Sequence, residues 1–401
     1  MTRTSVLMIV ANTYATDTRV RREVRTLTTR GLEVQALCWD RRGERPSREL
    51  IDRCLVRNVR FGKTAVLASS KTYYLISALL FQVVIFFRTI RQIRRTHAFI
   101  LHAHDFNTLL ACAAARCLFK ERIRLLYDSH ELTPGVYQEW YGSFISGLVS
   151  RLEHKALSHV DAIVGANEAI RDYLGSQAMI PAEAVYNCVE EVDIPRIDSA
   201  IAKKKLGLDG CFIVLFSGWV RQDYDFCTMV DAARELRRRG ISDIRFVFIG
   251  PVETMASLMG TTKSERLQDL FDFRGYVSDE DLLLYYVASD LCYAITSNLG
   301  PNTRILTPIK MFESMACGVP VAVNNGTLAA RIVQSWRCGI VVSENTPFSQ
   351  ELIRLMQNKE ELRSLGAAGM KAFHQVYNWD EMKARLLRLY DGLESSVQGR
   401  A

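Results

Sequence analysis

The feature that most constrains this chain is a series of short apolar runs, most of which end in small or polar residues. Such runs are typical of parallel strands that are buried on both faces of a sheet. Helical patterns separate them, such as the one over 18–31 that ends at Gly31. The alternation predicts an α/β fold built from doubly wound parallel sheets. The runs occupy 6–11, 32–38, 98–104, 123–130 and 160–166, and then 211–218, 244–250, 271–277, 289–295, 319–325 and 338–343.

The pattern restarts in the second half, and the 401 residues are too many for one core. We therefore expect two Rossmann-like domains, 1–189 and 190–378, that face each other across a cleft. The predicted seam is the polar stretch 186–195. A final helix pattern within 379–401 follows no strand and is expected to pack back on the first domain. Strand carboxyl ends and helix N-termini would line the cleft, and helix N-termini suit a phosphate.

Composition narrows the class of partner without naming it. The net charge of +7 favours anionic partners. No basic run is interleaved with aromatic residues, so we expect no nucleic-acid partner. The ten cysteines form no C-x-x-C pair, which predicts reduced thiols and a cytoplasmic protein. The first apolar run is too short for a signal peptide and is interrupted by Asn12, so a strand is expected there.

The stretch 72–87 contains no charged residue and is followed by the basic segment 88–95. Its 16 residues are fewer than the roughly 20 needed to span a bilayer, and Gln82 interrupts them. We favour a helix buried in the first domain. The alternative is a peripheral contact with a membrane through 72–95, in which arginines meet anionic headgroups.

The segment 306–323 poses a chemical question. A helix over 308–317 that ends at Gly318 places Lys310 and Glu313 on one face. The remainder of the helix is apolar, so an inward-facing carboxylate needs a partner. The two hydroxyls of a ribose would provide one, and the helix start could hold a diphosphate. A solvated ion pair between the two side chains is the alternative.

The stretch TPIKMFESMACGVPVAV resembles the signature of retaining GT-B glycosyltransferases, the "glycosyl transferases group 1" family. The resemblance implies an acceptor-binding first domain and a second domain that binds a nucleotide-diphosphate sugar. It also implies transfer with retention of configuration, without a metal or other cofactor, and UDP is favoured over GDP. Further similar segments follow in the family's order along nearly the whole chain: 16–37, 100–111, 125–132, 160–174, 184–190 and 215–233.

Roles for individual residues come from the same resemblance. Glu313 matches the glutamate that holds the donor ribose. His130 matches a histidine near the transferred sugar, and Asp105 a strand end that faces the acceptor. The implied catalytic residues are His130, Asp105, Arg221 and Lys310. The implied donor-binding residues are Glu313, Lys310, Gly218, Arg221, Gly275, Tyr276, Asn302, Thr303 and Arg304, and no metal ligands are implied.

This chain departs from the family where the diphosphate is neutralised. Typical members carry an Arg and a Lys at the positions that Trp219 and Tyr224 occupy here. We expect Arg221 to supply one positive charge, and Lys310 or Arg304 to supply the other. Family members have no essential protein nucleophile, so the resemblance implies that the leaving phosphate takes the acceptor proton. Domain closure would align the two substrates.

Three other functions stay open from the sequence. A nucleotide-sugar 2-epimerase of the same fold would need acid and base carboxylates, for which Asp105, Asp128 and Glu131 are candidates. A phosphorylase-like enzyme and a non-catalytic nucleotide-sugar-binding protein are the others. For a transferase, the acceptor is expected to be a glycan or lipid-linked glycan in surface polysaccharide assembly, and a small soluble acceptor is second. The location would be cytoplasmic, either free or peripheral on the inner face of the cell membrane.

Overall fold

In the computed structural model the chain divides into two compact units, and each is described by itself. The first comprises Met1–Tyr186 together with Met382–Ala401, and the second comprises Asn187–Glu381. The structure describes residues 4–60, 71–94, 99–221, 224–297 and 300–398.

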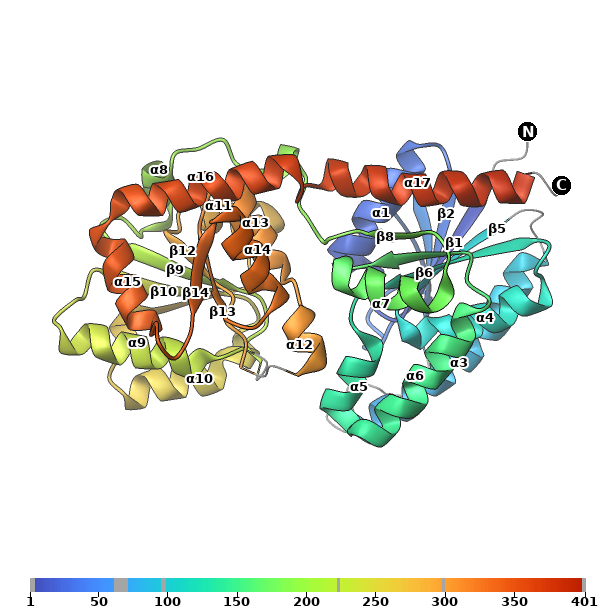
Figure 1. Ribbon diagram of the computed structural model, residues 1–401, viewed down its shortest axis with the longest axis horizontal. Helices are drawn as coiled ribbons and strands as arrows, with labels where there is room; N and C mark the ends of the chain where they lie inside the picture. Colours follow the sequence, from blue (N-terminus) through green and yellow to red (C-terminus); the bar gives the residue numbers. More distant parts are fainter. Residues whose placement is uncertain (1–3, 61–70, 95–98, 222–223, 298–299, 399–401) are drawn as a thin grey trace. The chain divides into compact units, whose positions relative to one another are not determined.

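The described residues of the first unit form an eight-stranded sheet in the order β3-β4-β2-β1-β5-β6-β7-β8 (Figure 1). All neighbouring strands are parallel except β3 and β4. The strand order reverses direction between β1 and β5, which makes this the switch point where ligands bind in open α/β sheets. The strands are β1 (Ser5–Val10), β2 (Glu33–Trp39), β3 (Arg48–Ile51), β4 (Cys54–Val59), β5 (Phe99–His104), β6 (Ile123–Ser129), β7 (Ala162–Gly165) and β8 (Ala182–Ala184).

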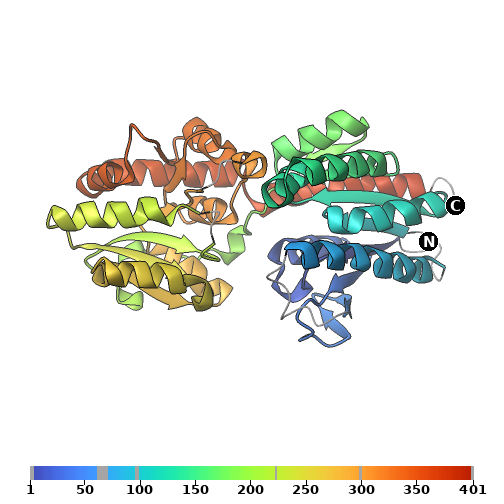
Figure 2. The ribbon, with the colours of Figure 1, turned by 90° about the horizontal axis from the view of Figure 1, so that it is seen from below.

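Helices pack on both faces of this sheet. Helix α1 begins at Asp17, whose carboxylate accepts a hydrogen bond from the Val20 N–H at 3.1 Å. On the opposite face, the Trp39 ring of β2 stacks on Phe81 of α3 at 4.8 Å. The C-terminal helix α17 lies along the first unit in Figures 1 and 2. The helices are α1 (Thr18–Thr29), α3 (Lys71–Ile93), α4 (Phe106–Leu118), α5 (Thr133–Tyr141), α6 (Ser143–Leu157), α7 (Glu168–Ala178) and α17 (Trp379–Gln398).

The second unit repeats the architecture with a six-stranded sheet in the order β11-β10-β9-β12-β13-β14. Every neighbouring pair is parallel, and the switch point lies between β9 and β12. A cluster of aromatic rings fills one side of the core, with Phe216 packed on Phe226 at 4.9 Å and on Phe248 at 5.5 Å. The strands are β9 (Phe212–Ser217), β10 (Ile244–Ile249), β11 (Phe271–Gly275), β12 (Leu291–Tyr293), β13 (Val321–Asn324) and β14 (Gly339–Val342).

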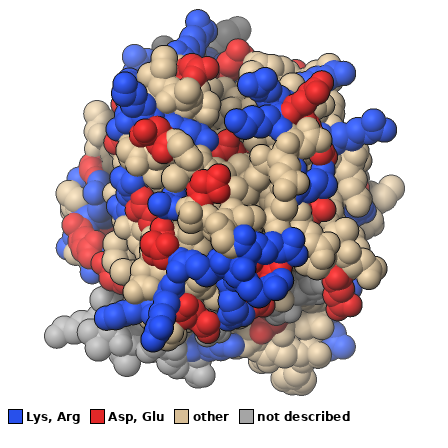
Figure 3. All heavy atoms as spheres, turned by 90° about the vertical axis from the view of Figure 1, so that its left-hand side faces the viewer, with Lys and Arg blue, Asp and Glu red and all other residues tan. Residues whose placement is uncertain are grey.

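Helices also lie on both sides of this second sheet (Figure 2). One outer face of the unit carries Lys and Arg side chains interspersed with Asp and Glu (Figure 3). At the end of α9, for example, Arg237 pairs with Asp269 and Arg238 pairs with Glu235. The helices are α8 (Ser199–Leu206), α9 (Phe226–Arg238), α10 (Val252–Ser264), α11 (Asp279–Val287), α12 (Pro301–Ile305), α13 (Ile309–Ala316), α14 (Leu328–Trp336), α15 (Phe348–Gln357) and α16 (Lys359–Gln375).

The predicted fold class, two doubly wound parallel α/β sheets, is confirmed. Each apolar run named from the sequence overlaps one observed strand. The sequence reading missed β3, β4 and β8. Strand β3 carries Arg48 and Glu49, β4 carries Arg57 and Asn58, and β8 has only three residues, so none of them is a continuous apolar run.

The expectation that 72–87 is too short to span a bilayer is wrong on length. Helix α3 has 23 residues, and Tyr73–Ile93 is long and apolar enough to cross a membrane by length and composition alone. Core helices pass the same test, and 33% of that window is buried inside the structure. Phe81 and Ile85 are fully buried, so one face of α3 belongs to the core, as the favoured interpretation expected.

Gly250 provides a test of the strand order in the second unit. Its φ is +155°, and an added Cβ would lie 2.1 Å from the Gly218 carbonyl oxygen, which is backbone and cannot move aside easily. Gly250→Ala should therefore lower the free energy of unfolding by about 3 kcal/mol. The matched control is Gly260→Ala within α10, where nothing lies within 4 Å. That variant should be neutral or stabilised by about 1 kcal/mol. Equal denaturant midpoints for the two variants would contradict the close approach.

Candidate functional site

The first unit has a pocket of about 190 Å³ at its switch point. Its wall is formed where β1 and β5 end, and helix α5 contributes aromatic side chains. The guanidinium of Arg41 lies over the Tyr74 ring, 5.1 Å from its centroid, and offers positive charge to the pocket. The lining residues that bear on function are Asn12, Arg41, Tyr74, Asp105, His130 and Trp140.

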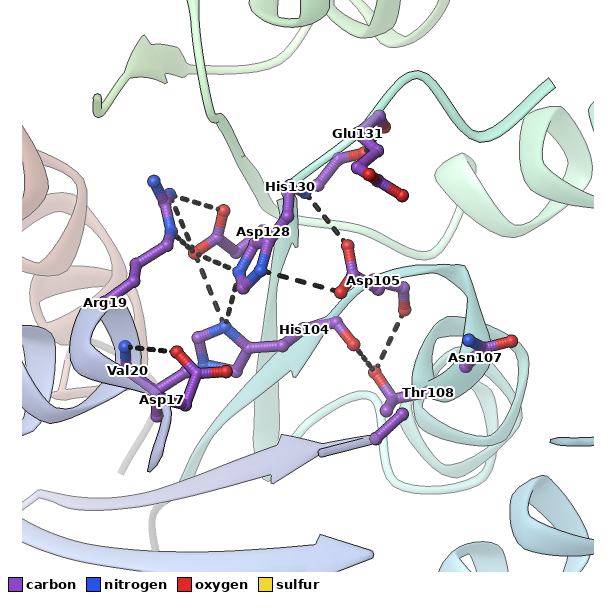
Figure 4. Close-up of polar contacts among 12 residues, drawn as sticks. Asp17, Arg19, Val20, His104, Asp105, Asn107, Thr108, Asp128, His130 and Glu131 are labelled. Atoms are coloured by element: carbon purple, nitrogen blue, oxygen red, sulfur yellow. Dashed lines mark hydrogen bonds and ion pairs between the residues drawn. The ribbon is translucent and has the colours of Figure 1, made fainter. Parts of the chain in front are cut away.

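Asp105 and His130 are brought together at this pocket, as Figure 4 shows. Asp105 Oδ1 accepts the His130 backbone N–H at 3.0 Å, and its Oδ2 lies 3.6 Å from His130 Nδ1. The backbone of Asp105 has φ 63° and ψ 164°, a region populated almost only by glycine. Strain of this kind persists only where neighbours hold it. Here the Asp105 N–H also donates to the Asp128 carbonyl at 2.8 Å.

Behind His130 lies a buried ion pair between Arg19 of α1 and Asp128 of β6. Arg19 Nη2 donates to the two carboxylate oxygens of Asp128 at 2.8 and 3.0 Å, and its Nη1 donates to the Val185 carbonyl at 2.6 Å. Burial alone would raise the pKa of Asp128, but Arg19 and His130 outweigh it and hold the pKa well below its usual value. Asp128 is thus buried and ionised, and it binds the Arg19 side chain.

His130 is the accessible member of this group, with its side chain 20% exposed. Its Nε2 lies 3.4 Å from Asp128 Oδ2 and 3.2 Å from His104 Nδ1. Burial would lower the pKa of His130, but the carboxylates of Asp105 and Asp128 raise it to about 10. The imidazolium at the pocket wall therefore carries a positive charge between two carboxylates.

In the second unit, α13 carries Lys310 and Glu313 toward the carboxyl end of β9. Both side chains are buried, with 3% and 7% of their surface exposed. Glu313 Oε2 accepts a hydrogen bond from the Tyr286 hydroxyl at 2.8 Å, and that hydroxyl lies 2.6 Å from the Oγ of Ser217, the last residue of β9. The alternative of a solvated ion pair is therefore wrong, because the helix that carries both residues is buried.

The ammonium of Lys310 is held between two aromatic rings. Its Nζ lies 3.8 Å from the centroid of Phe216 and 3.7 Å from that of Tyr224. A Cβ at Gly218 would lie 3.9 Å from the same atom, so the ammonium stands at the strand end where the switch point opens. Tyr224 is the position at which typical members carry their lysine. The ammonium that lies against the Tyr224 ring comes from α13.

The remaining predicted donor residues lie around the same edge of the second sheet. Gly275 ends β11 with φ +74°, and its carbonyl accepts the Gly250 N–H at 2.9 Å. Tyr276 follows it and is 78% exposed. Asn302 and Thr303 on α12 are buried, and Arg304, Arg221 and Trp219 are exposed. Positions 222–223 and 298–299, next to these loops, lie outside the described residues.

Several site residues escaped the sequence reading. Arg19 and Tyr286 each sit in a helix whose pattern looks ordinary, and only their partners 109 and 27 residues away reveal a role. Arg41 and Tyr74 lie in segments that carry no motif. Asp128, named as a candidate acid or base, is fully buried and engaged by Arg19, which argues against that role.

A cluster of four buried side chains that the sequence did not reveal lies behind His130. Glu23, His102, His104 and Asp128 are all buried and offer ligand atoms within 4.8 Å of one another. Burial and Asp128 raise the pKa of Glu23, and burial lowers the pKa of each histidine. The residues come from α1, β5 and β6, so no short spacing marks them in the sequence.

A chain with two doubly wound units, a buried carboxylate and ammonium at one switch point and a polar pocket at the other has the design of a GT-B glycosyltransferase. Comparison with known families supports this class. Residues 198–372 match the family described as "Glycosyl transferases group 1", and residues 15–187 match the "Glycosyl transferase 4-like domain". The chain belongs to the group 1 glycosyltransferases, and nucleotide sugars are the donors of this enzyme class.

Individual relatives are distant. The chain is 21% identical to the alpha-monoglucosyldiacylglycerol synthase of Acholeplasma laidlawii over 310 residues, which cover 71% of this chain and 73% of that protein. Among solved structures, sucrose-phosphate synthase from Thermosynechococcus elongatus superposes with a TM-score of 0.79 at 16% identity, covering 98% of this chain and all of the other. Anabaena HepE in complex with UDP-glucose gives 0.67 at 12% identity, covering 98% of this chain and 99% of the other. These structural likenesses show a shared fold.

The strained backbone at Asp105 yields a stability test that is independent of activity. Asp105→Ala and Asp105→Gly both remove the carboxylate that contacts His130, but only glycine adopts the observed φ and ψ without strain. Asp105→Gly should therefore be about 1 kcal/mol more stable than Asp105→Ala in urea unfolding. An alanine variant as stable as the glycine variant would show that the backbone at this position is unstrained.

Proposed function

We propose that this protein transfers a sugar from a UDP-sugar to a hydroxyl of a glycan or lipid-linked glycan acceptor, with retention of anomeric configuration. GDP-sugars are the second choice of donor. The reaction belongs to the hexosyltransferase class and to surface polysaccharide or glycoconjugate assembly. The observation that carries the proposal is the buried pair of Lys310 and Glu313 beside Gly218 at the switch point of the second sheet.

Glu313 is assigned to the ribose of the donor nucleotide. Glu313 is a buried carboxylate that accepts a hydrogen bond from the Tyr286 hydroxyl, and carboxylate oxygens each accept more than one hydrogen bond. Two vicinal hydroxyls suit such an acceptor. The base is assigned to the strand end at Gly275 and Tyr276, where backbone groups are available. The bound UDP-glucose named for Anabaena HepE supports UDP as the first donor to test.

Lys310 is assigned to bind the diphosphate, and the exposed side chains of Arg221 and Arg304 are assigned to contact the solvent-facing side of the same diphosphate. A nucleoside diphosphate gains negative charge as its bond to the sugar breaks, and a nearby cation stabilises that change. Phe216 and Tyr224 fix the ammonium without neutralising it, because rings attract a cation and carry no charge. With Lys310, Arg221 and Arg304 assigned to the phosphates, we propose that the transfer step needs no metal. Asn302 and Thr303 near the start of α12 are assigned to the same phosphates.

The first unit is assigned to the acceptor. Asp105 and His130 line its pocket, and they are proposed to orient the acceptor hydroxyl and the transferred sugar. In the transfer step the bond between the anomeric carbon and the phosphate oxygen breaks. The acceptor oxygen bonds to that carbon on the same face, and its proton passes to the leaving phosphate. This scheme needs no protein nucleophile, and it leaves His130 a positioning and electrostatic role.

A lipid-linked acceptor is favoured by the outer face of α3. The basic residues Arg88 and Arg91 follow this apolar face and are exposed, an arrangement that suits anionic headgroups. We propose peripheral attachment to the inner face of the cell membrane. The diacylglycerol in the name of the Acholeplasma laidlawii relative agrees with a lipid-borne acceptor. The apolar residues on this face, each at least half exposed, are Ile76, Leu79, Leu80, Val83 and Phe87.

The donor site predicts a selective thermal shift. UDP should raise the melting temperature of the wild-type chain more than GDP, ADP or NAD do. A hundredfold excess over Kd corresponds to about 2.7 kcal/mol of stabilisation. EDTA should leave the size of the UDP shift unchanged. Glu313→Ala and Lys310→Met should each weaken UDP binding by about a hundredfold, because each removes one or two charge-assisted contacts.

The control for these variants is Glu360→Ala on the exposed start of α16, which should bind UDP as the wild type does. Normal UDP affinity in Glu313→Ala would remove the ribose assignment. If no nucleotide raises the melting temperature of the wild type, the site with Trp219 and Tyr224 in place of Arg and Lys does not bind a diphosphate. A non-catalytic role would then rank first.

The outer face of α3 predicts binding to anionic vesicles. Wild-type chain should sediment with phosphatidylglycerol vesicles more than with phosphatidylcholine vesicles. The double variant Leu80→Ser, Val83→Ser should reduce the bound fraction about tenfold, because two apolar side chains no longer enter the bilayer surface. Leu50→Ser on edge strand β3 replaces a leucine that is more exposed than Leu80 and should bind like the wild type. Equal binding by both variants would exclude α3 as the contact.

A further inference from the structure

The buried cluster of Glu23, His102, His104 and Asp128 contains polar atoms that a folded protein rarely leaves unsatisfied. Among the described residues, Glu23 Oε2, His102 Nε2 and His104 Nε2 have no hydrogen-bond partner. All three side chains are 0 or 1% exposed. A buried polar atom without a hydrogen-bond partner costs about 1–3 kcal/mol of folding free energy. Three such atoms close together therefore indicate that a bound ion or water is missing from between them.

The three atoms face one another across distances that suit a shared ligand. Glu23 Oε2 lies 3.8 Å from His102 Nε2 and 4.0 Å from His104 Nε2. These separations are too long for direct hydrogen bonds. Two ligands bonded to one zinc ion at about 2.1 Å and at a tetrahedral angle lie about 3.4 Å apart. The observed gaps need to close by only about half an ångström.

The other nitrogen of each histidine already has the partner that a metal-binding imidazole needs. His102 Nδ1 lies 2.9 Å from the hydroxyl of Tyr390 on α17. His104 Nδ1 lies 3.4 Å from Asp128 Oδ2 and 3.2 Å from His130 Nε2. In the tautomer with the proton on Nδ1, donated to the Tyr390 hydroxyl by His102 and to Asp128 by His104, each Nε2 atom keeps a lone pair for a metal ion. Hydrogen bonds of this kind orient ligating histidines and set their tautomer.

The strand geometry explains why the ligands converge. His102 and His104 are two residues apart on β5, so they point to the same face of the sheet and their rings stack at 4.1 Å. Glu23 reaches them from α1, which covers that face. Arg19 pairs with Glu23 Oε1 at 3.2 Å but is shared with Asp128, so Glu23 Oε2 is left facing the two imidazoles.

We propose that Glu23, His102 and His104 bind one divalent transition-metal ion, zinc by preference, inside the first unit. Two imidazoles and one carboxylate form a ligand set that zinc accepts. Asp128 and Tyr390 are the outer partners of the histidines. The ion is taken up as the unit folds and holds α1 to β5. It lies behind His130 in the first unit, and the proposal gives it no part in neutralising the diphosphate.

The test uses full-length chain without a histidine tag, expressed in minimal medium that contains either Zn²⁺ or Co²⁺ as the added metal. We expect about one ion per chain by elemental analysis, and the visible absorption of Co²⁺ in a low-symmetry nitrogen and oxygen site. Glu23→Gln keeps the side-chain volume and should lower the bound metal about tenfold or more. Tyr390→Phe removes an outer partner and should weaken retention against a chelator by about 10- to 100-fold.

The matched control is His154→Gln on the exposed side of α6, which should retain the ion in full. Substoichiometric metal in wild-type chain from both media, with no Co²⁺ absorption, would overturn the proposal and leave a buried water as the occupant. Equal metal content in Glu23→Gln and the wild type would overturn it as well. The wild-type result stays decisive if Glu23→Gln fails to fold. None of these outcomes depends on UDP binding.

Discussion

The bidentate pairing of Arg19 with Asp128 is the interaction on which the first unit depends. It ties α1 to β6, and the third Arg19 contact reaches the Val185 carbonyl at the end of the unit's main chain segment. Removing one partner of such a buried pair leaves an uncompensated charge, which costs about 3–5 kcal/mol. The pair also fixes the carboxylate that contacts His130. Arg19 and Asp128 therefore contribute both to the packing of the first unit and to the charge of His130 at its pocket.

The same topological rule locates the candidate sites in both units. In each sheet the strand order reverses beside the first strand of the unit, so two neighbouring loops diverge and leave room at the carboxyl edge. In the first unit the space is lined by Asp105 and His130, and in the second Lys310 and Glu313 point toward it. Hydrogen bonds hold the first pair against the backbone strain at Asp105, and burial together with the Tyr286 hydroxyl holds the second. The two sites thus lie at the same place in their sheets, but different interactions hold their side chains.

The position of one positive charge links the two readings of the second unit. The family resemblance places a lysine where this chain has Tyr224, and the Tyr224 ring contacts the ammonium of Lys310, which comes from another helix. A cation acts on a phosphate through distance and orientation, so its place in the sequence is free to change. This contact is the observation behind the proposal that Lys310 faces the diphosphate.

The sequence by itself determined the fold class, because apolar strands that end in polar residues specify doubly wound sheets wherever they occur. It also favoured a buried α3 and an inward-facing Glu313, with a membrane contact and a solvated ion pair as the alternatives. The structure buries Glu313 but only one face of α3. Only the tertiary structure decided which distant residues meet. Arg19 with Asp128, Tyr286 with Glu313, and Glu23 with His102 are separated by 27 to 109 residues, and no local pattern encodes such pairs. Local periodicity determines which segments form helices and strands, whereas the order of strands in each sheet determines which side chains meet at the sites.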